Sequence, residues 1–222
     1  MSRTKTQYLI VGGTSGIGAE LANQLRDENS EVHIASRQTG LDISDEQSVY
    51  HYFERLGPID HVIVTAGSSA PSGRVLDVDT LEAKGAFETK FWGSIVVAKH
   101  AARYLKQGGS ITLTSGMLAR KVVANTYVKT AINAALEAVV KVLAKELAPI
   151  RVNVVSPGLT DTEAYLGLSE TQRGALFEQA KERLPVAKVG EPADVAMAYR
   201  LAIQNPYMTG SVIDVDGGAL LG

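Results

Sequence analysis

The sequence contains no cysteine in 222 residues, which excludes disulfides, thiolate catalysis and cysteine metal sites and is typical of a cytoplasmic protein. It has no apolar run of 18 or more residues, so it predicts no transmembrane helix, and no separate apolar signal segment precedes the first predicted strand. Charge is nearly balanced, with 22 Lys and Arg against 24 Asp and Glu. That balance argues against nucleic acid or an anionic membrane as a partner. The four histidines show no ligand spacing, so we expect no metal site.

The apolar pattern alternates between short strand-like runs and longer helix-like ones. Because no linker or repeat divides the chain, we predict one domain over residues 1–222. Helices are expected at residues 86–105, 129–147 and 192–203, and the alternation predicts a doubly wound parallel α/β sheet, Rossmann-like, with helices on both faces. Ligands of such sheets bind at the carboxyl ends of the strands. The predicted strands span residues 8–11, 32–35, 61–64, 110–114, 150–155 and 212–215.

A glycine-rich turn joins the first predicted strand to a helical pattern. It reads Val11-Gly12-Gly13-Thr14-Ser15-Gly16-Ile17-Gly18. Glycines let the backbone approach a ligand closely, and the free N–H groups and dipole of the following helix favour a pyrophosphate. Thr14 and Ser15 can add hydroxyl donors. The alternative is a plain strand-to-helix turn.

Three further segments complete a pattern with this turn: Val64-Thr65-Ala66-Gly67, the stretch 148–158 that ends Ser156-Pro157-Gly158, and Val215-Asp216-Gly217-Gly218. Together they resemble the short-chain dehydrogenase/reductase family over nearly the whole chain. The resemblance implies a nicotinamide dinucleotide, hydride transfer between a carbonyl and an alcohol, and a homodimer or homotetramer. Val11 departs from the family's TGxxxGxG, and Val64-Thr65 replaces both Asn residues of its NNAG turn.

The end of the second predicted strand bears on which dinucleotide binds. It reads Ala35-Ser36-Arg37, with no carboxylate for a ribose 2′-hydroxyl but with a guanidinium, the natural partner of a phosphate. We therefore expect NADP(H), although Arg37 can also be read as a solvated surface residue. Asp42-Ile43 resembles the family segment that contacts adenine. The predicted cofactor-binding residues are Gly12, Thr14, Ser15, Gly16, Ile17, Arg37, Asp42, Ile43, Thr65, Ala66, Gly67, Lys129, Pro157, Gly158, Leu159, Thr160 and Thr162.

Only four residues, 38–41, separate Arg37 from Asp42. The family places a helix there, but a parallel crossover needs about a dozen residues or more. We therefore expect this peripheral helix to be deleted, the second strand to be a sheet edge, and the adenine pocket to be open on one side.

The family's catalytic tetrad of Asn, Ser, Tyr and Lys is largely replaced. Ser115 matches the serine. Asn133 stands at the family's Lys position, Lys129 at its Tyr position and Lys90 at its Asn position, so Asn and Lys appear exchanged. Tyr127 is two residues out of register, about 200° around a helix, so it can replace the family tyrosine only if the helix starts later and Tyr127 lies on the loop. The catalytic candidates are Ser115, Lys90, Lys129 and Asn133.

Two interpretations of this tetrad compete. A rebuilt site would make the chain an NADPH-dependent oxidoreductase that reduces activated carbonyls such as quinones and diketones. Lysines near a nicotinamide should have lowered pKa values, which suits a proton donor. Otherwise the chain is a catalytically weak or inactive NADP(H)-binding module, and NAD-linked alcohol oxidation is a third possibility. Residues 160–185 correspond to the family's mobile lid, and the sequence does not name the substrate.

Overall fold

The computed structural model describes residues 5–67 and 69–221. Six parallel strands form one sheet in the order β2-β1-β3-β4-β5-β6, which confirms the doubly wound α/β fold. The strands are β1 (Thr6–Val11), β2 (Ser30–Ala35), β3 (Ile59–Val64), β4 (Leu105–Thr114), β5 (Arg151–Pro157) and β6 (Val212–Val215).

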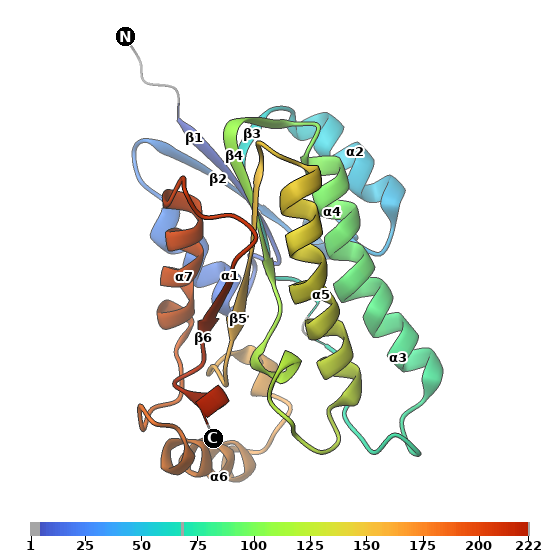
Figure 1. The fold of residues 1–222 in the computed structure, drawn as a ribbon, viewed down its shortest axis with the longest axis vertical. Helices are drawn as coiled ribbons and strands as arrows, with labels where there is room; N and C mark the ends of the chain where they lie inside the picture. Colours follow the sequence, from blue (N-terminus) through green and yellow to red (C-terminus); the bar gives the residue numbers. More distant parts are fainter. Residues whose placement is uncertain (1–4, 68, 222) are drawn as a thin grey trace.

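Helices cover both faces of the sheet (Figure 1). One face carries α1 (Gly16–Leu25) and α7 (Pro192–Gln204), and the other carries α2 (Glu46–Leu56), α4 (Gly93–Ala101) and α5 (Tyr127–Glu146). Two further helices, α3 (Thr80–Phe87) and α6 (Glu170–Arg183), lie toward the end of the molecule where the strands finish. No helix among the described residues is long and apolar enough to cross a bilayer.

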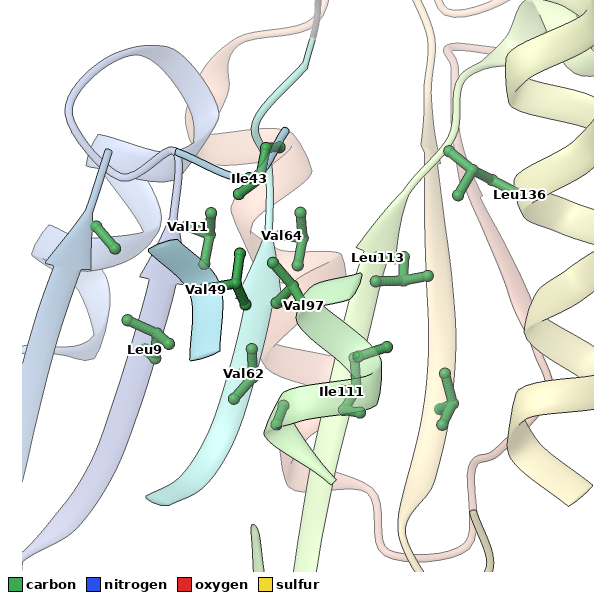
Figure 2. Packing of buried hydrophobic residues seen from close by; sticks show 14 of the residues in the cluster. Leu9, Val11, Ile43, Val49, Val62, Val64, Val97, Ile111, Leu113 and Leu136 are labelled. Carbon is green, nitrogen blue, oxygen red and sulfur yellow. The ribbon is translucent and has the colours of Figure 1, made fainter. Parts of the chain in front are cut away.

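The apolar strands are explained by two hydrophobic cores, one on each face. Leu9 and Val11 belong to the core under α2, α4 and α5 (Figure 2), whereas Ile10 belongs to the core under α1 and α7. Val62 and Ile63 divide in the same way. Successive residues of a strand point to opposite faces, so a strand buried on both faces reads as a continuous apolar run.

The peripheral helix after β2 is absent, as expected. Between Ala35 and Asp42, all of which are described, the chain forms only a 3₁₀ turn at Arg37–Thr39. Gly40 ends this turn with a φ of 89°, and the Leu41 backbone N–H donates to Ser36 O at 2.9 Å. β2 is therefore an edge strand.

The expected helix at residues 86–105 is wrong at both ends. Helical structure begins at Thr80, passes through a π-helical turn at Glu88–Trp92 and ends at Ala101. Leu105 already belongs to β4, where it pairs with Ile59 of β3. The spacing of Leu105 fits the helical pattern, but Leu105 is a strand residue whose apolar side chain packs against the core.

The carboxyl ends of the strands meet at one edge of the sheet. Val11 pairs with both Ala35 and Val64, and Thr114 pairs with Val155. The loops that follow these five positions are therefore close together, at the edge of the sheet where the sequence predicts that a ligand binds.

Candidate functional site

The glycine turn after β1 has room only for glycine. Gly12 has a φ of +93°, and a Cβ added to it would lie 2.6 Å from Ala66 N. A Cβ on Gly18 would lie 2.4 Å from Gly12 O. Thr65 packs against both glycines and donates its hydroxyl to Val11 O at 3.2 Å. Thr65 and Ala66 therefore hold the turn in shape from the neighbouring strand.

The first turn of α1 leaves its backbone N–H groups available. Ser15 precedes the helix in an extended conformation, and in the described structure its hydroxyl makes no capping hydrogen bond. The first turn of this helix carries no acidic residue. Uncapped N–H groups and the helix dipole together make an anion site. Thr14 and Ser15 are exposed beside it, and Ile17 packs against the core under α1.

A cleft of about 700 Å³ begins at this turn. Arg37 lies exposed at its wall, and the neighbouring Ser36 Oγ is buried without a hydrogen-bond partner in the described part of the chain. Asp42 accepts from Ser44 N and Oγ, which lowers the pKa of its carboxyl, and the Arg37 charge lowers it further. Predicted cofactor residues that line the cleft are Gly12, Arg37, Asp42, Ile43, Ala66 and Gly67.

Five more predicted cofactor residues, Pro157, Gly158, Leu159, Thr160 and Thr162, lie where β5 leads into the segment before α6. A Cβ on Gly158 would lie 2.6 Å from Asp216 Cα, and the Thr160 hydroxyl donates to Gly158 O at 3.1 Å. Thr162 and Gly16 share a second cleft of about 430 Å³. Asp161 pairs with Arg173, which ties α6 to this segment. Neither cleft is lined by Thr14, Ser15, Ile17, Thr65, Lys129, Pro157, Gly158, Leu159 or Thr160.

Lys90 lies on the π-helical turn between α3 and α4. Its Nζ donates to Asn133 Oδ1 at 2.7 Å and to Ser115 O at 3.1 Å. A Cβ on Gly67 would lie 2.9 Å from Lys90 Cα, so the turn packs directly on the loop after β3. π turns occur mostly as single turns inside α-helices and are frequent at functional sites.

Lys129 joins this pair through the register of α5. It precedes Asn133 by four residues, so both side chains lie on one face of the helix. Burial, followed by the positive charge of Lys129, lowers the pKa of Lys90 to about 8. The structure thus brings Lys90, Lys129 and Asn133 together.

The hydroxyl of Ser115 points away from this group. It donates to Glu137 Oε1 at 3.0 Å, and Glu137 pairs with Arg120, which also binds Asp214. Ser115 therefore offers Lys90 only its carbonyl oxygen. A Cβ on Gly116 would lie 3.0 Å from Asn133 Nδ2, so position 116 faces the group.

Tyr127 is the first residue of α5 and therefore helical, so the register argument against it applies. It is 40 % exposed and lines a separate cleft of about 380 Å³ with Val123 and Thr130. Neither Lys90 nor Asn133 lines that cleft.

Sequence reasoning missed two features of the site. One is Ser36, which lines the cleft and could have been found from its position next to Arg37. The other is the contact of Ser115 with Glu137, which nothing in the sequence indicated. The described residues contain no group of three or more His, Asp or Glu side chains that could hold a metal.

The sequence is similar to a known protein family and to several of its members. The family model described as Enoyl-(Acyl carrier protein) reductase matches residues 34–219. The short-chain dehydrogenase/reductase ATR9 of Stachybotrys chlorohalonatus is 34 % identical over 248 residues, covering 96 % of each chain. Carbonyl reductase family member 4 of Danio rerio is 31 % identical over 238 residues, covering 96 % of this chain and 97 % of that one.

Among solved structures, a small-chain dehydrogenase in complex with NADPH is 71 % identical, with a TM-score of 0.97, and the match covers 98 % of this chain and 100 % of that chain. The MalC reductase/Diels-Alderase from Malbranchea aurantiaca is 25 % identical, with a TM-score of 0.86, and the match covers 99 % and 97 %. The family model and the nearly full-length relatives show that this chain belongs to the short-chain dehydrogenase/reductase family.

Proposed function

We propose that this protein is an NADPH-dependent oxidoreductase that reduces activated carbonyl compounds, such as quinones and diketones, with Lys90 as the proton donor. The observation that carries the proposal is the position of Lys90 Nζ, 2.7 Å from Asn133 Oδ1, together with a pKa of about 8. An acid whose pKa lies near the working pH transfers protons efficiently.

The residues of the cleft fit NADP(H). A Cβ on Gly12 or Gly18 would clash with the protein's own atoms, so only glycine lets the turn close tightly. Such a turn at the start of a helix is suited to binding a pyrophosphate. The unpartnered Ser36 hydroxyl and the Arg37 guanidinium would hold the 2′-phosphate, and Asp42 would lie at the adenine end. The NADPH complex of a 71 % identical protein supports this assignment. When bound, the cofactor supplies the hydride.

The lysines do the remaining work at the substrate oxygen. An ammonium has three donors, and Lys90 uses two of them on Asn133 Oδ1 and Ser115 O. The third donates to the carbonyl oxygen and gives it a proton as negative charge develops. The neutral amine that remains is held by the same two acceptors. Lys129 faces the same space and stabilises the developing charge.

Activated carbonyls are favoured because position 129 has no tyrosine and the Ser115 hydroxyl is bound to Glu137. Quinones and diketones spread the developing charge themselves, so they depend less on the protein. The same two facts favour the second candidate, an NADP(H)-binding module without turnover. NAD-linked alcohol oxidation is disfavoured by Arg37. We further propose a homodimer or homotetramer located in the cytoplasm.

Turnover separates the two candidates. NADPH oxidation is followed by absorbance with a quinone, an α-diketone and a plain aliphatic ketone of similar size. We expect reduction of the first two and little of the third, with NADH much less effective. Tight NADPH binding without reduction of any carbonyl would replace the enzyme with the binding module.

A further inference from the structure

The lysine pair at the candidate active site has no negative partner. Lys90 bonds only to two neutral oxygens, those of Asn133 and Ser115. Lys129 forms no ion pair or hydrogen bond within the described residues. Other partly buried cations do have carboxylate partners. Lys106 pairs with Asp60, and Arg120 pairs with Glu137.

Nearby carboxylates are already committed elsewhere. Glu137 lies one turn after Asn133 on α5 but faces Arg120 and Ser115. Lys90 and Lys129 are both partly buried, and their like charges repel one another. This arrangement is unfavourable unless something negative joins them. The fold keeps both lysines without supplying that charge.

A third donor faces the same space. Because Asn133 Oδ1 accepts from Lys90, its Nδ2 is directed toward Gly116, where a Cβ would lie 3.0 Å away. Asn133 is buried, and no side chain at position 116 stands against its amide. Three donors, Lys90 Nζ, the Lys129 ammonium and Asn133 Nδ2, therefore lie near one another.

We propose that Lys90 and Lys129 form an anion subsite that recognises an ionised acid group, a carboxylate or an enolate oxygen, next to the carbonyl of the substrate. This inference rests on the proposed function and narrows its substrate class to 2-oxo acids and acidic diketones. Asn133 Nδ2 adds a neutral hydrogen bond to the same group. A charge-assisted hydrogen bond from Lys129 distinguishes such substrates from neutral carbonyls of the same size. Lys90, whose third N–H donates to the carbonyl oxygen, attracts the acid group by its charge.

The test measures binding and not turnover. Oxalate, a dianion with adjacent carboxylates, and oxamide, its neutral counterpart, are titrated calorimetrically into the NADPH-loaded protein. Reduced cofactor is used because its nicotinamide ring is uncharged, so any selectivity for oxalate comes from the protein. We expect oxalate to bind and oxamide to bind at least tenfold more weakly.

Variants assign the binding to the pair. Lys129→Met should weaken oxalate at least tenfold, and Lys129→Arg should retain most of the affinity because it keeps the charge. Lys141→Met, which removes an exposed lysine from the same helix, is the matched control and should change the affinity less than twofold. Lys129 has no partner to lose, so these variants test the subsite without disturbing the fold.

The outcomes separate this inference from the function on which it rests. If NADPH binds but oxalate does not, or if Lys129→Met and Lys141→Met weaken oxalate equally, the anion subsite is wrong and the proposed reductase stands. If NADPH itself does not bind, the proposed function fails, and the subsite fails with it as a substrate site.

Discussion

The cleft and the lysine site, which comprises Lys90, Lys129 and Asn133, lie at the same edge of the sheet, but they are built differently. At the glycine turn where the cleft begins, a Cβ on Gly12 or Gly18 would meet backbone atoms 2.4–2.6 Å away. At the lysine site, Lys90 Nζ donates to Asn133 Oδ1. The backbone sets the shape of the first region and side chains set the chemistry of the second, so the two regions should respond differently to substitution.

The largest expected effect comes from Lys90→Met. Loss of the proton donor should lower kcat toward activated carbonyls by about 10²–10⁴, while NADPH affinity changes less than about threefold because the variant leaves the cleft intact. Steady-state kinetics and fluorescence titration of NADPH measure the two effects. Lys84→Met, at an exposed lysine on α3, is the control. Equal losses in kcat and NADPH affinity would show that Lys90 acts in cofactor binding and that the lysine site is not separate from the cleft.

Gly18→Ala should disturb the glycine turn at which the cleft begins and leave the lysine site intact. Its Cβ would lie 2.4 Å from Gly12 O, and overpacking of this kind costs about 1–3 kcal/mol. We expect weaker NADPH binding and a lower melting temperature. Gly174→Ala, in α6 with open space around it, should instead stabilise the protein by about 0.5–1 kcal/mol. Unaltered NADPH binding by Gly18→Ala would contradict the backbone argument.

Arg37→Ala tests cofactor choice within the cleft. A charge-assisted contact to the 2′-phosphate is worth about 1.5–3 kcal/mol, so NADPH should bind about tenfold more weakly or worse. NADH affinity should not change, because NADH has no phosphate there. Arg55→Ala on α2 is the control. Equal weakening of both cofactors would show that Arg37 does not contact the phosphate.

The pH dependence of kcat/KM reports on Lys90. Its pKa is lowered from 10.5 to about 8, so the ammonium is present below pH 8 and is lost as the pH rises through that value. The rate of reduction should be level near pH 6–7 and fall until about a tenth remains at pH 9. Residual activity of Lys90→Met should lack this inflection. An inflection that persists in the variant would assign it to another group.

Tyr127→Phe should have the smallest effect, less than about twofold on kcat. Tyr127 is offset by about 200° around the helix from the position of the family tyrosine, so its hydroxyl should not reach the substrate. Tyr127 lines the separate cleft with Thr130 and not the lysine site. The same assay is used, with folding checked by thermal melting. Loss of activity with the fold intact would make Tyr127 the acid and would show that the register is wrong.

The fold was predictable because strands such as β1 and β3 carry apolar residues on both faces, as Leu9 and Ile10 do. The short link after Arg37 likewise predicted the edge strand, since chain length limits what a crossover can contain. The proximity of Lys90 and Asn133 followed from motif register, although their chemical roles stay a prediction.

The direction of the Ser115 side chain after β4 and the π turn between α3 and α4 were not predictable from the sequence. The direction of the Ser115 hydroxyl depends on Glu137 and Arg120, which are distant in sequence. The π turn at Glu88–Trp92 adds one residue to a helix and hardly alters its apolar spacing. The end of that helix at Ala101 was missed because Leu105 fits helix and strand equally.

The missing helix after β2 also affects how copies of the chain meet one another. An edge strand presents unpaired backbone groups that can template a foreign strand. β2 is only six residues long, and its Glu31 and His33 place polar side chains along it, 3.7 Å apart. Short length and charge are devices that limit pairing between edges. Without a helix to cover it, β2 relies on its short length and its polar residues to resist aggregation.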